Sequence, residues 1–274
     1  MIMKKDLILF LGQSNMQGQT EKLSETAQVE NALEYKFLTD TLEPLKNPVG
    51  ETITFDMKAG FDFTDMNMQG EWLKAHVLGK SAYGNTNMVP EFCRAYIKES
   101  GRSVVAVHAA KGSTDISFWL NAGYDAIVKK TMAAIDKVRK ENIGGIYCVW
   151  LQGESDALKG TEKSAYKSAL ITLKDNLKRD IGIERFGIIK VGAFAMDKRD
   201  QEIFSAQEEA CAEDKDFIML TRITEKLVYD QKFLNSDAFG HYGSYGQEVL
   251  GRSAGKNLAR AVNGKEFDTE EIIL

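Results

Sequence analysis

The chain has 274 residues, 43% of them hydrophobic and 27% charged, as is typical of an ordinary soluble globular protein with a substantial core. A formal net charge of −5 and the lack of a basic cluster argue against nucleic acid as a partner. No apolar run is long enough to cross a membrane, and the start passes directly into an apolar strand without a cleavage site. We therefore expect a cytoplasmic protein with no membrane partner; the composition favours no particular oligomeric state.

Five nearly continuous apolar runs predict strands that are covered on both faces: Leu7–Leu11, Ser103–His108, Gly145–Leu151, Phe186–Ala193 and Asp216–Leu220. Helical stripes lie between them, one from Tyr124 to Val138 and another from Tyr166 to Leu177, and a last helix begins at the capping box Ser244-x-x-Gln247. This alternation predicts the α/β class: a three-layer α/β/α sandwich around a central, mainly parallel five-stranded sheet. We expect a single domain over residues 1–274.

One segment, residues 41–87, breaks the alternation. It contains two of the three prolines, scattered aromatic residues and no clear period. Because so long an irregular insertion is usually functional, we expect it to form a rim or lid over the site.

A serine follows the first strand, in Gly12-Gln-Ser14. Gly12 permits a tight turn that lifts the Ser14 hydroxyl out of the sheet, at the edge where α/β proteins bind ligands. A serine at this place is also a common helix cap, so a nucleophile needs a neighbouring base as further support.

The chain has three histidines. His76 falls in the irregular insertion, and His108 closes the second strand, where a core histidine bonded to backbone is expected. His241 lies in a polar loop that follows the last strand and returns to the same sheet edge as Ser14, so it is the best general base. Asp237, four residues earlier, is placed to accept from the second ring nitrogen and fix the tautomer.

Two further polar clusters close the second and third strands. The second strand ends in Ala110-Lys-Gly112-Ser-Thr, and the third in Gln152-Gly-Glu154-Ser-Asp156. Backbone N–H groups and a side-chain amide that converge on one crevice are the components of an oxyanion hole. A capped loop with solvated acids is the alternative interpretation of the second of these clusters.

Four blocks in order carry a resemblance to the SGNH hydrolases. They are G-Q-S-N-M, A-x-G-x-T-x-I-x-x-W, W-x-Q-G-E-x-D and G-H-Y-x-x-x-G-Q-x-x-L-G, and they span Gly12 to Gly251. Within that superfamily the chain is similar to the sialate O-acetylesterase and acetylxylan esterase branch, carbohydrate esterase family six. The resemblance implies an SGNH-type, flavodoxin-like sandwich.

The resemblance also implies roles for individual residues. Ser14 corresponds to the nucleophile and His241 to the general base, and the N–H groups of Ser14 and Gly112 with the Gln152 amide correspond to the oxyanion hole. The chain departs from the family where Ser113 replaces a common glycine, and where Asp237 stands four rather than three residues before the histidine. Glu154 is the competing orienting acid, and the choice between Asp237 and Glu154 stays open.

The resemblance implies a serine esterase that removes acetyl groups from a small acetylated carbohydrate, such as acetylated sialic acid or xylan, through an acetyl-enzyme. No cofactor is expected, and the lack of H-x-x-x-H or cysteine pairs argues against a zinc site. The alternatives are an esterase on a non-carbohydrate ester and a non-catalytic carbohydrate-binding protein on the same fold.

Overall fold

The structure, a computed structural model, describes residues 4–21, 27–50 and 86–274. All five predicted strands are present, as β1 (Lys5–Gly12), β4 (Ser103–Ala110), β5 (Ile143–Leu151), β6 (Arg185–Ile189) and β7 (Phe217–Thr221). They pair in parallel in the order β4-β1-β5-β6-β7. Counted among themselves this is the order 2-1-3-4-5, which is the flavodoxin-like arrangement.

The predicted number of strands is wrong: within the described residues the sheet has seven strands rather than five. The two further strands are β2 (Ala32–Lys36), parallel to β4, and β3 (Thr41–Pro44), antiparallel to β2 at the sheet edge. Both are short and only partly buried. Charged side chains therefore interrupt their apolar pattern, and the rule for strands covered on both faces did not detect them.

The predicted insertion at 41–87 is also corrected in part, because its first residues form β3. Residues 51–85, which include His76, lie outside the described residues.

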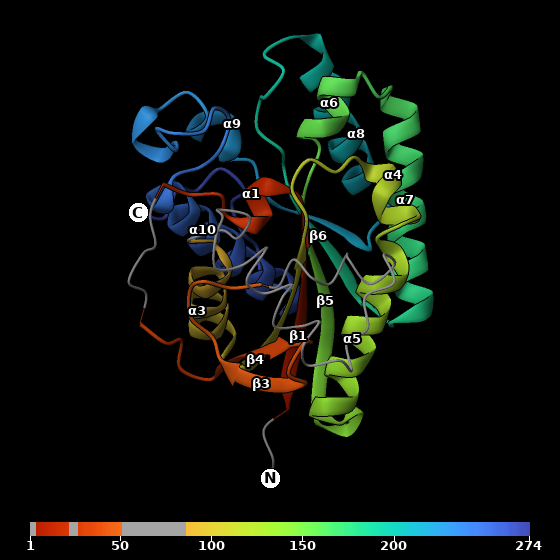
Figure 1. Ribbon diagram of the computed structural model, residues 1–274, viewed down its shortest axis with the longest axis vertical. Helices are drawn as coiled ribbons and strands as arrows, with labels where there is room; N and C mark the ends of the chain where they lie inside the picture. Colours follow the sequence, from red (N-terminus) through yellow and green to blue (C-terminus); the bar gives the residue numbers. More distant parts are fainter. Residues whose placement is uncertain (1–3, 22–26, 51–85) are drawn as a thin grey trace, which may run out of the picture.

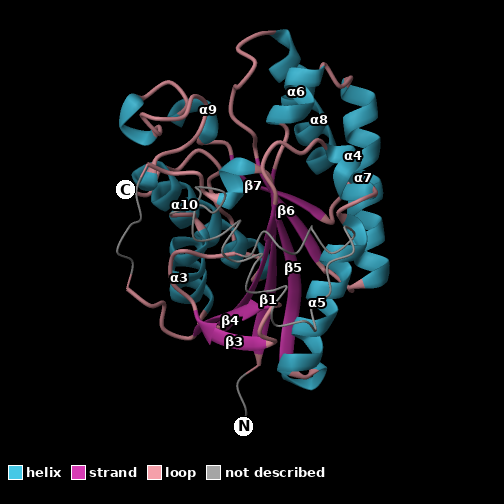
Figure 2. Ribbon diagram, viewed as in Figure 1, coloured by secondary structure: helices cyan, strands magenta, loops and turns pink. Residues whose placement is uncertain are grey.

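Helices cover both faces of the sheet, which confirms the predicted three-layer sandwich (Figures 1 and 2). The longer ones are α3 (Val89–Ser100) and α10 (Ser244–Val262) on one face, and α5 (Tyr124–Val138), α7 (Lys163–Asp180) and α8 (Lys198–Glu213) on the other. Short helices lie in the connections: α1 (Ser14–Gln17), α4 (Ile116–Leu120), α6 (Glu154–Lys159), α9 (Thr224–Leu227), and the 3₁₀ turns η2 (Lys140–Asn142) and η3 (Gln231–Phe233). Among the described helices, none combines the length and apolar character needed to span a membrane.

The core is built around β1, in which every side chain from Leu7 to Leu11 is completely buried. Phe10 packs edge-to-face on Phe92 of α3 with ring centroids 5.0 Å apart, while Trp150 of β5 packs on Trp119 of α4 at 5.5 Å. Burial of each such side chain stabilises the fold by about 1.5–3 kcal/mol. The central strands are thus held on both sides, and their carboxyl ends form a rigid base.

The carboxyl ends of β1 and β5 lie side by side at the topological switch point of the sheet. The chain leaves β1 toward the face covered by α3 and leaves β5 toward the opposite face, which carries α7 (Figure 1). A crevice at such a point is where doubly wound sheets bind ligands. The two polar blocks that follow β1 and β5 therefore face each other.

Candidate active site

The turn after β1 holds Ser14 at the start of α1, with Gln13 as the N-cap residue. Gly12 has φ of +152°, and a Cβ atom there would lie 2.0 Å from the carbonyl oxygen of Leu151. Only glycine fits so close to β5, so the sharp turn expected from the sequence is imposed by the sheet itself. Since Ser14 is in the first helical turn, its N–H has no acceptor within the helix.

The next residue, Asn15, joins this turn to the histidine loop. Its side-chain Nδ2 donates to the Gly240 carbonyl at 3.2 Å, and its Oδ1 accepts from the Tyr242 N–H at 3.1 Å. These two partners are the residues on either side of His241. The structure therefore brings the Ser14 turn and the His241 loop together, although they are more than 200 residues apart in the chain.

His241 is half-buried, and its Nδ1 lies 2.8 Å from the carbonyl oxygen of Phe239. A carbonyl only accepts, so Nδ1 carries a proton, and in the neutral imidazole the lone pair is then on Nε2. The Phe194 ring and the imidazole pack in a T-shaped arrangement with centroids 6.0 Å apart. The imidazole is thus held in the tautomer that a general base needs.

His108 takes no part in this arrangement. It is buried, and its Nε2 lies 3.0 Å from the Met16 carbonyl, as expected for a core histidine bonded to backbone.

The two acids proposed to orient His241 both have other partners. The Asp237 side chain is exposed, and its carboxylate accepts from the Ser236 hydroxyl at 3.0 Å. Glu154 is buried at the start of α6, and its Oε1 accepts from Asn15 Nδ2 at 2.8 Å. Among the described hydrogen bonds, the His241 ring donates to the Phe239 carbonyl and not to either acid.

Burial gives Glu154 an unusual acidity. Desolvation raises the pKa of its carboxyl from 4.5 to about 7, and the hydrogen bond from Asn15 offsets only part of this effect. Within the described part of the chain, its second oxygen, Oε2, is buried and has no hydrogen-bond partner. The neutral carboxyl is therefore the prevailing form below about pH 7.

Gly112 lies next to the predicted nucleophile: a Cβ atom on Gly112 would be 3.6 Å from the Ser14 Cβ. Its N–H donates to the side-chain Oε1 of Gln17 at 3.1 Å. The acceptor on this N–H is therefore a carbonyl oxygen, the same kind of atom as the acyl oxygen of an ester. Ser113, which follows, has φ of +59°, in the left-handed region that explains the family's glycine here.

Gln152 is completely buried beneath the site. Its Nε2 donates to Asp156 Oδ2 at 2.6 Å and to the Thr114 carbonyl at 3.0 Å, and its Oε1 accepts from the Tyr166 hydroxyl at 3.1 Å. Both amide hydrogens are thus directed at acceptors of the protein. Its role as an oxyanion donor stays a prediction, and it requires that Gln152 give up one of these bonds.

Sequence reasoning missed four residues that shape the site: Asn15, Gln17, Phe239 and Gln247. The predicted capping box of α10 is wrong, because Gly243 is the N-cap residue and the Ser244 N–H donates to the Glu21 carboxylate. Gln247 instead donates from Nε2 to the Asn15 carbonyl at 2.9 Å. The available signals were the positions of Asn15 and Gln247 inside two of the four blocks.

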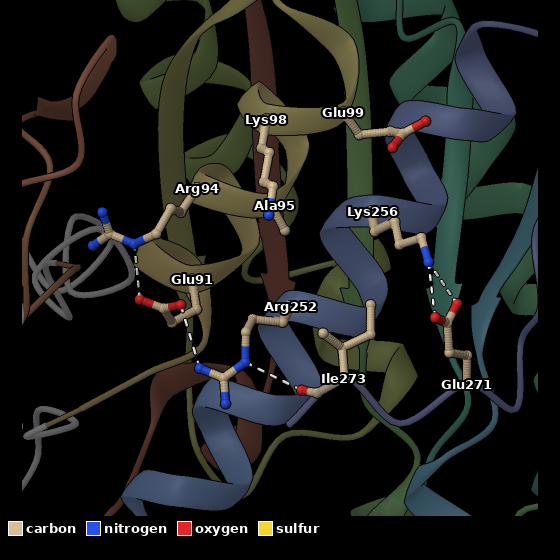
Figure 3. A pocket seen from close by; sticks show the side chains of 9 residues that line it. All are labelled: Glu91, Arg94, Ala95, Lys98, Glu99, Arg252, Lys256, Glu271 and Ile273. Carbon is tan, nitrogen blue, oxygen red and sulfur yellow. Dashed lines mark hydrogen bonds and ion pairs between the residues drawn. The ribbon is translucent and has the colours of Figure 1, made fainter.

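A separate surface cavity of about 400 Å³ lies along α3 and α10 (Figure 3). Its charged side chains are largely paired with one another: Glu91 with Arg94 and Arg252, and Lys256 with Glu271. None of the predicted site residues lines it. This cavity is therefore distinct from the crevice at the strand ends.

The comparisons with known proteins agree with this geometry. The family model for carbohydrate esterase, sialic acid-specific acetylesterase, matches residues 4–260. No curated protein matches the chain significantly.

Similar solved structures include a protein from Arabidopsis thaliana, with a TM-score of 0.67, 18% identity, and coverage of 93% of this chain and 98% of that one. An acetyl-xylooligosaccharide esterase from Geobacillus has a TM-score of 0.49 and 9% identity, covering 92% of this chain and 94% of that one. A carbohydrate acetylesterase from Xanthomonas citri has a TM-score of 0.48 and 14% identity, covering 94% of this chain and 56% of that one. Because the family model spans nearly the whole chain, the protein is a carboxylic ester hydrolase that belongs to the sialic acid-specific acetylesterase family of carbohydrate esterases.

Proposed function

We propose that this protein is a serine esterase that removes O-acetyl groups from a small carbohydrate, with Ser14 as the nucleophile and His241 as the general base. The observation that carries the proposal is the bridge from Asn15 to both neighbours of His241, because it brings the two loops to one place. The bond from His241 Nδ1–H to the Phe239 carbonyl is a second support, since in the neutral ring it leaves Nε2 as the nitrogen that can take the serine proton.

The reaction begins when the Ser14 oxygen attacks the acetyl carbonyl and its proton passes to His241 Nε2. Negative charge then develops on the acyl oxygen, where the N–H groups of Ser14 and Gly112 donate to it. The Gln17 oxygen must leave the Gly112 N–H for this to happen. When the tetrahedral intermediate collapses, His241 protonates the departing sugar hydroxyl, and water releases acetate from Ser14 by the same steps.

In this account the Phe239 carbonyl does what an acid does in most serine triads. It holds Nδ1–H and so fixes the tautomer, and its partial negative charge faces the imidazolium that forms during attack. A carbonyl carries no full charge, so the imidazolium is stabilised less than it is by a carboxylate. Asp237 and Glu154 then act outside the proton transfer.

Acetate release from a panel of O-acetylated sugars tests this function, with acetylated sialic acids and acetylated xylo-oligosaccharides compared with long-chain acyl esters. We expect release from at least one acetylated sugar and a loss of more than about a hundredfold in Ser14→Ala, which removes the nucleophile. Faster hydrolysis of long-chain esters than of any acetylated sugar favours a non-carbohydrate ester. Binding of sugars without acetate release favours a non-catalytic carbohydrate-binding protein.

A further inference from the structure

We infer that Asn15 is a positioning residue that sets the place of His241 relative to Ser14, and that Glu154 anchors it. The inference rests on the proposed function, because it concerns how the predicted base reaches the predicted nucleophile. It also gives buried Glu154 a role that does not require contact with His241.

The first argument is connectivity. Asn15 follows Ser14 directly in α1, and its carboxamide binds the backbone of Gly240 and Tyr242 at 3.2 and 3.1 Å. The backbone on both sides of His241 is therefore fixed to the residue after the nucleophile. A displacement of the histidine loop from Ser14 must break at least one of these bonds.

The second argument is the direction of the Asn15 amide. The Tyr242 N–H is a donor and requires the amide oxygen, while the Gly240 carbonyl is an acceptor and requires the amide nitrogen. Only one orientation of the side chain satisfies both partners, because a reversed amide would place its NH₂ group against the Tyr242 N–H. The same nitrogen donates to Glu154 Oε1 at 2.8 Å, and this third bond anchors the amide in that orientation.

The third argument is burial. Asn15 and Glu154 are 3% and 2% exposed, so water does not readily replace a lost partner. The Gln247 amide holds the Asn15 carbonyl at 2.9 Å as well. The Asn15 side chain is therefore buried, and an Asn15 amide group that loses its hydrogen-bond partner pays a desolvation penalty.

The matched test compares Asn15→Ala with Asn257→Ala. Asn257 of α10 is also buried, and its Nδ2 donates to the Leu220 and Asp268 carbonyls at 2.8 and 2.9 Å, but none of its bonds reaches a predicted site residue. Melting temperature and the kinetics of acetate release are measured for both variants.

Because a misplacement of about 1 Å costs about a hundredfold in rate, Asn15→Ala should lower kcat about a hundredfold with KM changed less than about threefold. Asn257→Ala should keep kcat within about threefold of the wild type although its melting temperature also falls. Equal kcat values in the two variants would overturn the inference, whereas a wild-type protein without acetate release would overturn the proposed function instead.

A second pair of variants keeps the inference testable if Asn15→Ala does not fold. Glu154→Gln retains a carbonyl oxygen that accepts from Asn15 Nδ2, whereas Glu154→Ala removes the anchor. We expect kcat of Glu154→Gln to exceed that of Glu154→Ala by about tenfold or more, the usual scale for a buried hydrogen bond to a carboxyl group. Equal kcat values in this pair would refute the anchoring role of Glu154.

Discussion

Replacement of Glu154 by glutamine should make the protein more stable at alkaline pH and leave its stability unchanged near pH 4. The carboxyl pKa is 4.5 in the unfolded chain and about 7 in the fold, because burial disfavours the charged form. Between these two values the unfolded chain releases the proton while the folded chain keeps it. The contribution of Glu154 to stability therefore falls as pH rises from about 4.5 to 7 and is constant above that range.

The magnitude follows from the same two values. Each tenfold change in proton affinity corresponds to about 1.4 kcal/mol, so ionisation of Glu154 in the fold costs about 3 kcal/mol at pH 8. Glutamine keeps the oxygen that accepts from Asn15 and has no charge to bury. For a chain of this length the difference corresponds to a rise in melting temperature of about 6 °C or more.

The assay is the melting temperature of the wild type and of Glu154→Gln at intervals from pH 4 to 8.5. The control is Glu141→Gln, because Glu141 is exposed and its replacement should change stability by less than about 0.5 kcal/mol at every pH. The difference between Glu154→Gln and the wild type should grow through the range in which Glu154 titrates. A difference that stays constant with pH would refute the argument.

Three other variants test the remaining parts of the site. Asp237→Asn should keep kcat within about tenfold, because His241 is oriented by a backbone carbonyl; a loss of about four orders of magnitude would make Asp237 the orienting acid. Gln17→Met should lower KM for an acetyl ester by about two- to tenfold, since it frees the Gly112 N–H from an internal acceptor; a higher KM would mean that Gln17 binds substrate or supports the turn. Gln152→Ala should lower the free energy of unfolding by about 3 kcal/mol in a denaturant titration, because it removes one buried hydrogen-bond partner each from Asp156 and Tyr166, and an unchanged value would contradict that structural role.

The five central strands were predictable because each is buried on both faces and therefore appears in the sequence as a continuous apolar run. β2 and β3 were not, because they contain charged residues such as the half-exposed Lys36 and the exposed Glu43. Strands at this end of the sheet need fewer apolar residues than the central ones, so their local pattern resembles that of a loop.

The sequence predicted only those parts of the site whose position follows from the topology of the parallel sheet. Residues such as Ser14 and Gln152, which follow parallel strands, are brought to one edge by the topology alone. The hydrogen-bond partner of His241 was not predictable, because Phe239 offers a backbone carbonyl and every residue has one. The partner of Gln247 was not predictable either. Its spacing from Ser244 matches a capping box, but its side-chain amide donates to the Asn15 carbonyl, which is far away in the sequence.

The central claim, that Ser14 is the nucleophile of an acetylesterase, is tested most directly by covalent labelling. The protein is treated with a serine-reactive phosphonate, digested and mapped by mass spectrometry, while acetate release is followed in the same samples. The account predicts a single label on the peptide that contains Ser14, no label in Ser14→Ala, and loss of acetate release in proportion to labelling. A label on another residue, or full labelling of Ser14 with acetate release intact, would contradict it.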